Sequence, residues 1–140
     1  MVITTTFYTV KLKENISVTD SDPIAFRALS IILAYFKESK QYIIVDTKNP
    51  KDLRSPWPSI LVCHDSVTYF KIGLDSNHLI RTANSLEAVV IWAGLFHLFN
   101  IDFYQGTKKT NEFFDFLLFK KFAVSGESAV RTLIKKLQLA

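Results

Sequence analysis

The stretch Ser85-Leu-Glu-Ala-Val-Val-Ile-Trp-Ala-Gly-Leu-Phe-His-Leu-Phe99 decides how this chain folds, because it is a predicted helix with almost no polar side. A helix on the surface of a protein has one apolar stripe, whereas a helix that is apolar all round is buried on every side. A second predicted helix, Asn111-Glu-Phe-Phe-Asp-Phe-Leu-Leu-Phe-Lys-Lys-Phe122, is comparably rich in phenylalanine. A chain of 140 residues has few places to bury two such helices. The surplus apolar surface therefore indicates contact with a partner.

Six apolar side chains of these two segments are the predicted partner contacts: Trp92, Leu95, Phe96, Phe99, Phe113 and Phe116. Aromatic anchors carry much of the free energy of a protein interface, and each Å² of apolar surface removed from water contributes about 25 cal/mol. We therefore expect a homo-oligomer or a complex with another protein. Burial of the same residues between a sheet and other helices of the chain is the competing interpretation.

Capping signals bound both helices. Asn84-Ser85-Leu86-Glu87 is a capping-box pattern, and Asn100 is the expected end because asparagine tolerates the left-handed conformation that ends helices. The second helix is expected over Thr110 to Phe122, and Lys120-Lys121 should bring its C-terminal end to solvent. The longest apolar run, Ala88 to Phe99, is shorter than the roughly 20 residues that a membrane helix needs.

The rest of the chain has strand patterns first and a helix last. The expected elements are a strand at Val2 to Lys13, a helix from Ser21-Asp22-Pro23 to about Glu38, a buried strand at Gln41 to Asp46, strands at Ser59 to Cys63 and Val67 to Ile72 joined by a turn at 64–66, a short strand at His78 to Thr82, and an amphipathic helix that begins near Ser125-Gly126-Glu127. We predict one domain, residues 1–140, of the α+β class, with a small, mainly antiparallel sheet packed by three to four helices.

The composition is that of a globular protein, with 49% hydrophobic and 21% charged residues. The single cysteine, Cys63, excludes an intramolecular disulfide and fits a reducing compartment. The N-terminus lacks the basic region, apolar stretch and cleavage site of a signal peptide. We therefore expect an intracellular protein without membrane contact, in the cytoplasm or the nucleus.

The net charge of +4 raises an alternative function, nucleic-acid binding. It requires basic residues gathered on one face. The candidates lie in the last third of the chain: Lys108, Lys109, Lys120, Lys121, Lys135 and Lys136, with Arg131 between them. The competing interpretation is an ordinary solvated lysine surface, because the chain has no arginine-rich run and no glycine-rich phosphate loop.

No group of residues has the pattern of an enzyme or a metal site. The run Cys63-His64-Asp65 contains the residue types of a nucleophile, a base and an orienting acid. In a strand, however, His64 faces away from both neighbours. The three histidines, His64, His78 and His97, lack the helical i, i+3 or i, i+4 pairing with another ligand type. We predict a non-enzymatic protein with no catalytic residues, no cofactor and no metal.

Trp57 stands between Pro56 and Pro58 in the one long loop of the chain. An exposed tryptophan held by two prolines would be a recognition anchor. The competing interpretation is that it folds back over the sheet.

The stretch Pro58 to Phe119, together with Trp57, contains several motifs that resemble one family. They are Trp57-Pro58-Ser-Ile-Leu-Val, Val67-Thr-Tyr-Phe-Lys-Ile, Ser85-Leu-Glu-Ala-Val-Val, Leu95-Phe-His-Leu-Phe-Asn100-Ile-Asp-Phe-Tyr104 and Asn111-Glu-Phe-Phe-Asp-Phe-Leu. This pattern resembles a C-terminal domain of uncharacterised, transposon-derived animal proteins, although Gln105 stands where that family has a proline after the tyrosine. The resemblance implies an accessory or interaction domain of a mobile-element-derived protein, without catalytic residues.

Overall fold

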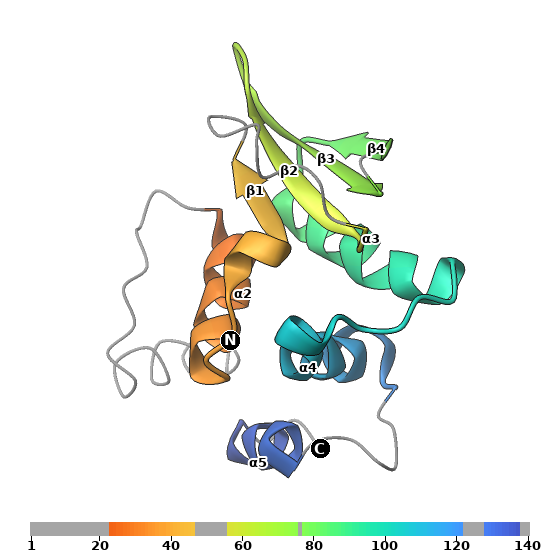
Figure 1. Ribbon diagram of the computed structural model, residues 1–140. Helices are drawn as coiled ribbons and strands as arrows, with labels where there is room; N and C mark the ends of the chain where they lie inside the picture. Colours follow the sequence, from red (N-terminus) through yellow and green to blue (C-terminus); the bar gives the residue numbers. More distant parts are fainter. Residues whose placement is uncertain (1–22, 47–55, 76, 122–127, 138–140) are drawn as a thin grey trace.

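A computed structural model describes residues 23–46, 56–75, 77–121 and 128–137 (Figure 1). The described part contains four α-helices and a four-stranded mixed sheet, which confirms the α+β prediction. In chain order the elements are α2 (Ile24–Tyr35), a 3-10 turn η1 (Lys40–Tyr42), β1 (Ile44–Asp46), β2 (Ser59–His64), β3 (Thr68–Leu74), β4 (Asn77–Thr82), α3 (Ser85–Leu98), a 3-10 turn η3 (Gln105–Thr107), α4 (Lys108–Phe119) and α5 (Ser128–Lys136).

The strands lie in sequence order, β1-β2-β3-β4. β1 pairs with β2 in parallel, and the two remaining pairs are antiparallel, so the sheet is mainly antiparallel as predicted. Ile60 of β2 lies opposite Ile72 of β3, which in turn lies opposite Ile80 of β4. Because side chains alternate along a strand, this row defines one face of the sheet.

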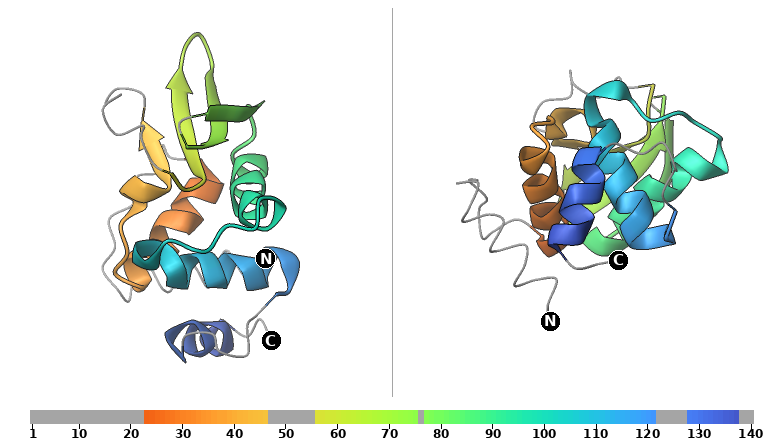
Figure 2. Two further views of the ribbon diagram at one scale, coloured as in Figure 1. Left: turned by 45° about the vertical axis from the view of Figure 1, so that its right-hand side comes forward. Right: turned by 90° about the horizontal axis from the view of Figure 1, so that it is seen from below.

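The helices in the described part of the chain cover that one face in layers (Figures 1 and 2). α2 and α3 pack against each other directly under the sheet, α4 packs below them, and α5 packs on α4. One hydrophobic core runs through these layers, with Leu29 from α2, Ile72 from β3, Trp92 from α3, Phe113 from α4 and Leu133 from α5. None of the described helices is long and apolar enough to cross a membrane.

α3 lies at the centre of this core. Its buried side chains face the sheet, α2 and α4, and the Trp92 indole N–H donates a hydrogen bond to the Pro58 carbonyl at 3.1 Å. Trp92, Leu95, Phe96 and Phe113 are all buried, so their assignment as partner contacts is wrong and the competing interpretation holds for these four. Six of its fourteen side chains are buried, whereas Leu86, Val90 and Leu98 are apolar and exposed.

Three helices end with a residue in the left-handed conformation. Asn100 follows α3 at φ 52°, as its asparagine predicts, and the Asn84 side chain accepts a hydrogen bond from the Glu87 N–H at 2.9 Å at the start. Lys37 ends α2 at φ 58°, so that helix ends at Tyr35, before the expected Glu38. The Glu38 N–H then bonds to the Leu33 carbonyl at 2.8 Å, as in a Schellman motif.

α4 differs from the prediction at both ends. It begins at Lys108 instead of Thr110, and it ends at Phe119 because Lys120 turns left-handed at φ 57°. Its first turn contains no acidic residue and no cap from its own sequence. The carboxylate of Glu38 takes that role, since it accepts hydrogen bonds from the N–H groups of Lys109 and Thr110 at 3.2 and 2.9 Å.

The remaining strand predictions are confirmed in part. The hairpin of β2 and β3 and the short strand β4 are present as expected. The run from Gln41 to Asp46 is a strand only from Ile44, because residues 40–42 form the 3-10 turn. The expected strand at Val2 to Lys13, the start at Ser21-Asp22 and the helix opening at Ser125-Gly126-Glu127 lie outside the described residues.

Candidate interaction site at the end of helix α3

The C-terminal end of α3 presents two large apolar side chains to solvent. Leu98 is 73% exposed and Phe99 is 48% exposed. They follow one another in sequence, at the point where the chain leaves the helix and reverses at Asn100. Phe96, three residues before Phe99, lies in the core. Of the six predicted partner contacts, Phe99 is therefore the one that is exposed at this end.

An open groove of about 480 Å³ is lined by His97 and Asn100, the residues that flank these two in the sequence. It is formed where α3 ends, where the extended segment 101–104 passes, and where α4 ends. The lining combines apolar and polar residues: Phe96, His97, Asn100, Ile101, Asp102, Phe103, Asp115 and Lys121. We call Leu98, Phe99 and this groove together the α3 terminal surface.

A histidine and an aspartate pair inside the groove. His97 Nε2 lies 2.7 Å from Asp115 Oδ1, and the imidazole also meets the Phe119 ring edge to face at 5.5 Å. Asp115 is only 8% exposed. Burial raises the pKa of its carboxyl group, while the hydrogen bond and charge of His97 and the charge of Lys121 lower it. The pair fixes the end of α3 to the end of α4 and gives the groove a polar floor.

The pair has the geometry of a base and its orienting acid, but the groove offers nothing for it to activate. No Ser, Thr or Cys is among the described residues that line it. The described part of the chain also contains no cluster of three His, Cys, Asp or Glu side chains that could hold a metal ion.

The other predicted sites are placed elsewhere. Phe116 is half-buried, with the Lys120 ammonium 5.4 Å from its ring centre. Trp57 is also half-buried and folds back onto the Tyr104 ring, with ring centres 4.3 Å apart, so it is not an exposed anchor. Cys63 is buried on one side of β2, whereas His64 pairs with Asp46 at 3.1 Å, as the alternation of strand side chains predicts.

The six candidate lysines do not form one basic face. Lys108 and Lys109 lie at the start of α4, and Lys120 and Lys121 lie just after its end. Ten residues of helix, 110–119, lie between the two pairs, and Lys108 and Lys120 are about 18 Å apart along the axis. The third pair lies on α5, and its Lys136 approaches the Tyr35 ring of α2 at 5.2 Å.

Sequence reasoning missed Leu98, His97 and Asp115 as parts of a common site. The exposure of Leu98 could have been predicted, because Leu98 lies just before the expected helix end, where fewer elements of the chain pack over the helix. His97 and Asp115 are 18 positions apart, and only the packing of α3 on α4 brings them together.

Comparisons of the chain with protein-family models, with curated proteins and with solved structures found no match. The resemblance to the transposon-derived domain stays a prediction.

Proposed function

We propose that this chain is a non-enzymatic interaction module that self-associates through the α3 terminal surface. The observation that carries the proposal is the pair Leu98 and Phe99, both exposed, next to a groove with an apolar wall. A protrusion and a groove that lie side by side on one surface can complement a second copy of the same surface. A two-fold dimer needs this property, because each contact between residues i and j then occurs twice.

The apolar part of the contact would come from Phe99. In the proposed dimer the ring of Phe99 enters the partner's groove, against Ile101 and Phe103. Leu98 covers the edge of this contact from outside. Both side chains lose solvent-exposed apolar area, and the gain is about 25 cal/mol for each Å² buried.

The charged rim of the groove supports a second copy as the occupant. The groove contains an exposed carboxylate, Asp102, and an exposed ammonium group, Lys121. In a two-fold arrangement Lys121 can face the partner's Asp102, and the reverse pair forms on the other side of the axis. Exposed pairs of this kind contribute about 0.2–1 kcal/mol each and mainly fix the orientation of the partners.

The size of the surface predicts weak association. A stable interface buries roughly 800 Å² on each partner, whereas two protruding side chains and one open groove offer a smaller apolar centre. We therefore expect a dissociation constant in the range of about 1–100 μM, which corresponds to roughly −8 to −5.5 kcal/mol. An accessory interaction role is also what the resemblance to the transposon-derived domain implies.

Sedimentation velocity from about 1 to 200 μM tests the proposal over the expected range of dissociation constants. The wild-type chain should shift from monomer to dimer as its concentration rises. Leu98→Glu and Phe99→Glu should each remain monomeric with an unchanged circular dichroism spectrum, because both residues are exposed at the site.

Leu86→Glu is the matched control, since Leu86 is an exposed leucine in the first turn of the same helix. It should dimerise like the wild type. A wild-type chain that is monomeric throughout the concentration range would overturn self-association, and equal loss of dimer in the Leu86 variant would place the interface elsewhere.

A further inference from the structure

The face of the sheet that points away from α2 and α3 has its own chemistry. Val45, Leu61, Cys63 and Tyr69 form a small apolar cluster that is separate from the main core. The strand register places them opposite one another, as in Val45 with Leu61 and Cys63 with Tyr69. The helices of the described part lie on the other side of the sheet (Figure 2). We call this side the outer sheet face.

Two cations lie directly opposite each other on the outer sheet face. Lys71 of β3 is the cross-strand partner of Arg81 of β4, and Leu61 of β2 lies on the other side of Lys71. Directly opposed side chains have Cβ atoms about 4.5–5.5 Å apart, and like charges in that position are destabilising. The outward-facing positions of the described strands next to this pair carry no Asp or Glu.

The Tyr69 ring holds these cations in place. The Arg81 guanidinium carbon lies 3.8 Å from the ring centre, and Lys71 Nζ lies 6.0 Å from it. The ring face attracts both cations without neutralising either of them. The nearby carboxyl group of Asp65 is bound to the Tyr69 hydroxyl, and this hydrogen bond is the main reason that the pKa of Tyr69 is raised.

The stacked Arg81 also provides a flat surface. The guanidinium carbon lies over the Tyr69 ring, and Arg81 itself is exposed. Guanidinium planes and aromatic rings are the surfaces on which unpaired bases stack in proteins that bind single strands. A planar cation beside a second cation therefore fits a ligand that combines flat rings with negative charge.

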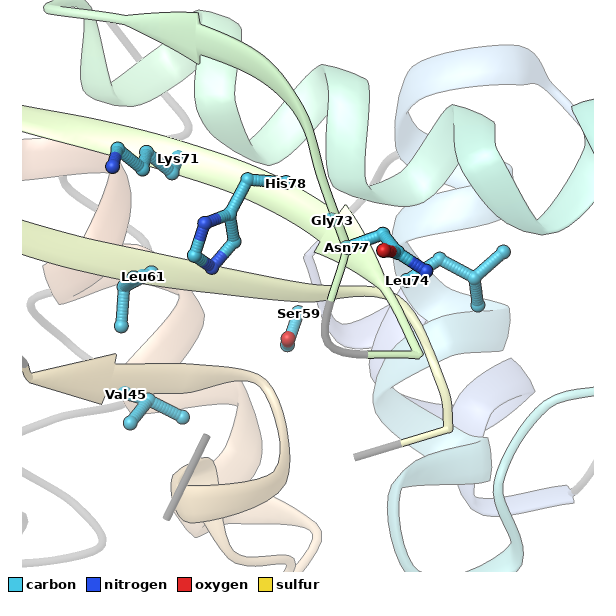
Figure 3. A pocket seen from close by; sticks show the side chains of 8 residues that line it. All are labelled: Val45, Ser59, Leu61, Lys71, Gly73, Leu74, Asn77 and His78. Carbon is cyan, nitrogen blue, oxygen red and sulfur yellow. The ribbon is translucent and has the colours of Figure 1, made fainter. Parts of the chain in front are cut away.

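A shallow pocket next to Lys71 adds polar groups to this face (Figure 3). Ser59, Asn77 and His78 line it together with Lys71, and Figure 3 shows the His78 ring between Lys71 and Ser59. Its volume is about 10 Å³, which is room for a single water molecule. The pocket is thus too small for a base, but it suits a phosphate oxygen or the water that bridges to one.

Gly73 shapes this pocket. A Cβ atom at this position would lie 2.1 Å from the Asn77 backbone oxygen, so only glycine allows β4 to approach β3 this closely. The register between the two strands shifts at the same point, between Ile72 and Gly73. The close approach brings His78 opposite Gly73, on the same side as Lys71.

We propose that the outer sheet face binds the phosphate backbone of a single-stranded nucleic acid. Lys71 and Arg81 contact phosphates, Arg81 offers its planar guanidinium to a base, and the Ser59 and His78 side chains supply hydrogen bonds. A duplex fits this face poorly, because a groove of DNA is entered by a helix or a protruding two-stranded ribbon. The net charge of +4 favours association with a polyanion.

Fluorescence anisotropy with labelled oligonucleotides of about 12 nucleotides, single-stranded and duplex, tests the proposal; a sheet-face site of this kind spans roughly 4–16 nucleotides. Two phosphate contacts to a single strand give a slope of log K against log salt of about −1.4, so affinity should fall roughly sevenfold between about 50 and 200 mM salt. The double variant Lys71→Gln/Arg81→Gln should lose most of the affinity and nearly all of this slope.

The matched control is Lys135→Gln/Lys136→Gln, which removes the same charge from α5, where the sequence alone placed a phosphate contact. It should change the affinity by no more than about twofold. The proposal is overturned if the wild-type chain binds neither RNA nor DNA single strands at low salt, or if the two double variants lose affinity equally. It is also overturned if an Asp/Glu-rich peptide or phosphatidylserine vesicles bind the same face more tightly than a single strand does.

A second measurement separates binding from folding. Because Lys71 repels Arg81, Lys71→Gln alone should keep or raise the melting temperature while it weakens binding. A variant that melts earlier than the wild type and loses binding in proportion would show that Lys71 only supports the fold, and would refute its role as a phosphate contact.

Discussion

Glu38 is the residue whose substitution tests the architecture most sharply. Its carboxylate lies between two distant parts of the chain and accepts three hydrogen bonds: from the Lys109 N–H at 3.2 Å, from the Thr110 N–H at 2.9 Å and from the Thr110 hydroxyl at 2.7 Å. It also places a negative charge at the N-terminal end of α4, which has no acidic residue in its own first turn. Glu38→Ala removes all of these interactions together.

The cost can be worked out from these contacts. Loss of a helix N-cap costs about 0.5–2 kcal/mol, and a hydrogen bond to a charged group contributes about 1.5–3 kcal/mol. These contributions overlap, since the cap consists of the same bonds, so we expect Glu38→Ala to lower the free energy of unfolding by roughly 2–4 kcal/mol. Thr110→Val removes only the hydroxyl donor at a fully buried position and should cost about 1 kcal/mol.

Urea denaturation followed by circular dichroism measures both variants, with Glu38→Gln as the test of charge. Glutamine keeps one acceptor and loses the negative charge, so it should lie between wild type and Glu38→Ala. Amide exchange of α4 should accelerate in Glu38→Ala more than exchange of β2 and β3, because the lost bonds belong to the first turn of that helix. A loss below about 0.5 kcal/mol in Glu38→Ala, the level of an ordinary surface substitution, would refute the reasoning.

Three further predictions concern other parts of the molecule. Burial raises the pKa of the Asp115 carboxyl group in the folded protein. The stability that this group contributes is therefore present below the ordinary aspartate pKa of about 4, and it is lost as the pH rises through the raised pKa. His97→Leu removes a hydrogen bond and a charge that lower the pKa of Asp115, so it raises that pKa further. His97→Leu should therefore cost about 1–3 kcal/mol at pH 7 and less at pH 4 in urea titrations, and a loss equal at both pH values would contradict this account. Trp92→Phe should cost about 1–3 kcal/mol, because it leaves the buried Pro58 carbonyl without its donor; an unchanged melting temperature would argue against that bond. Gly94→Ala should stabilise α3 by up to about 1 kcal/mol, because only the Phe119 ring lies near the new methyl group, at 3.9 Å. Gly73→Ala should instead lower the free energy of unfolding by about 1–3 kcal/mol. A higher melting temperature for the Gly73 variant than for the Gly94 variant would refute the packing described at both sites.

The site was only partly predictable from the sequence. The apolar character of α3 was evident from the sequence, but four of the six predicted contacts lie in the core. Phe96 and Phe99 are three residues apart on one helix and chemically identical. Only Phe96 meets Phe103, at 5.2 Å between ring centres, and Trp92, at 5.8 Å. Hydrophobicity alone cannot distinguish such positions, because exposure depends on which elements pack over them.

Local signals were sufficient for the elements that depend on short-range contacts. The Asn84 cap, the left-handed Asn100 and the hairpin of β2 and β3 all follow from residues within a few positions of each other. Caps, turns and side-chain alternation act over these distances, so the sequence by itself determined the class of the fold and the bounds of α3.

The tertiary structure alone decided the features that join distant segments. Glu38 starts α4 from more than 70 positions away, and His97 meets Asp115 only because α3 packs on α4. The opposition of Lys71 and Arg81 likewise depends on the register shift between β3 and β4. Each of these contacts forms only when the assembled core holds the two segments together. A local sequence pattern cannot predict such a contact, because the two segments are far apart in the sequence.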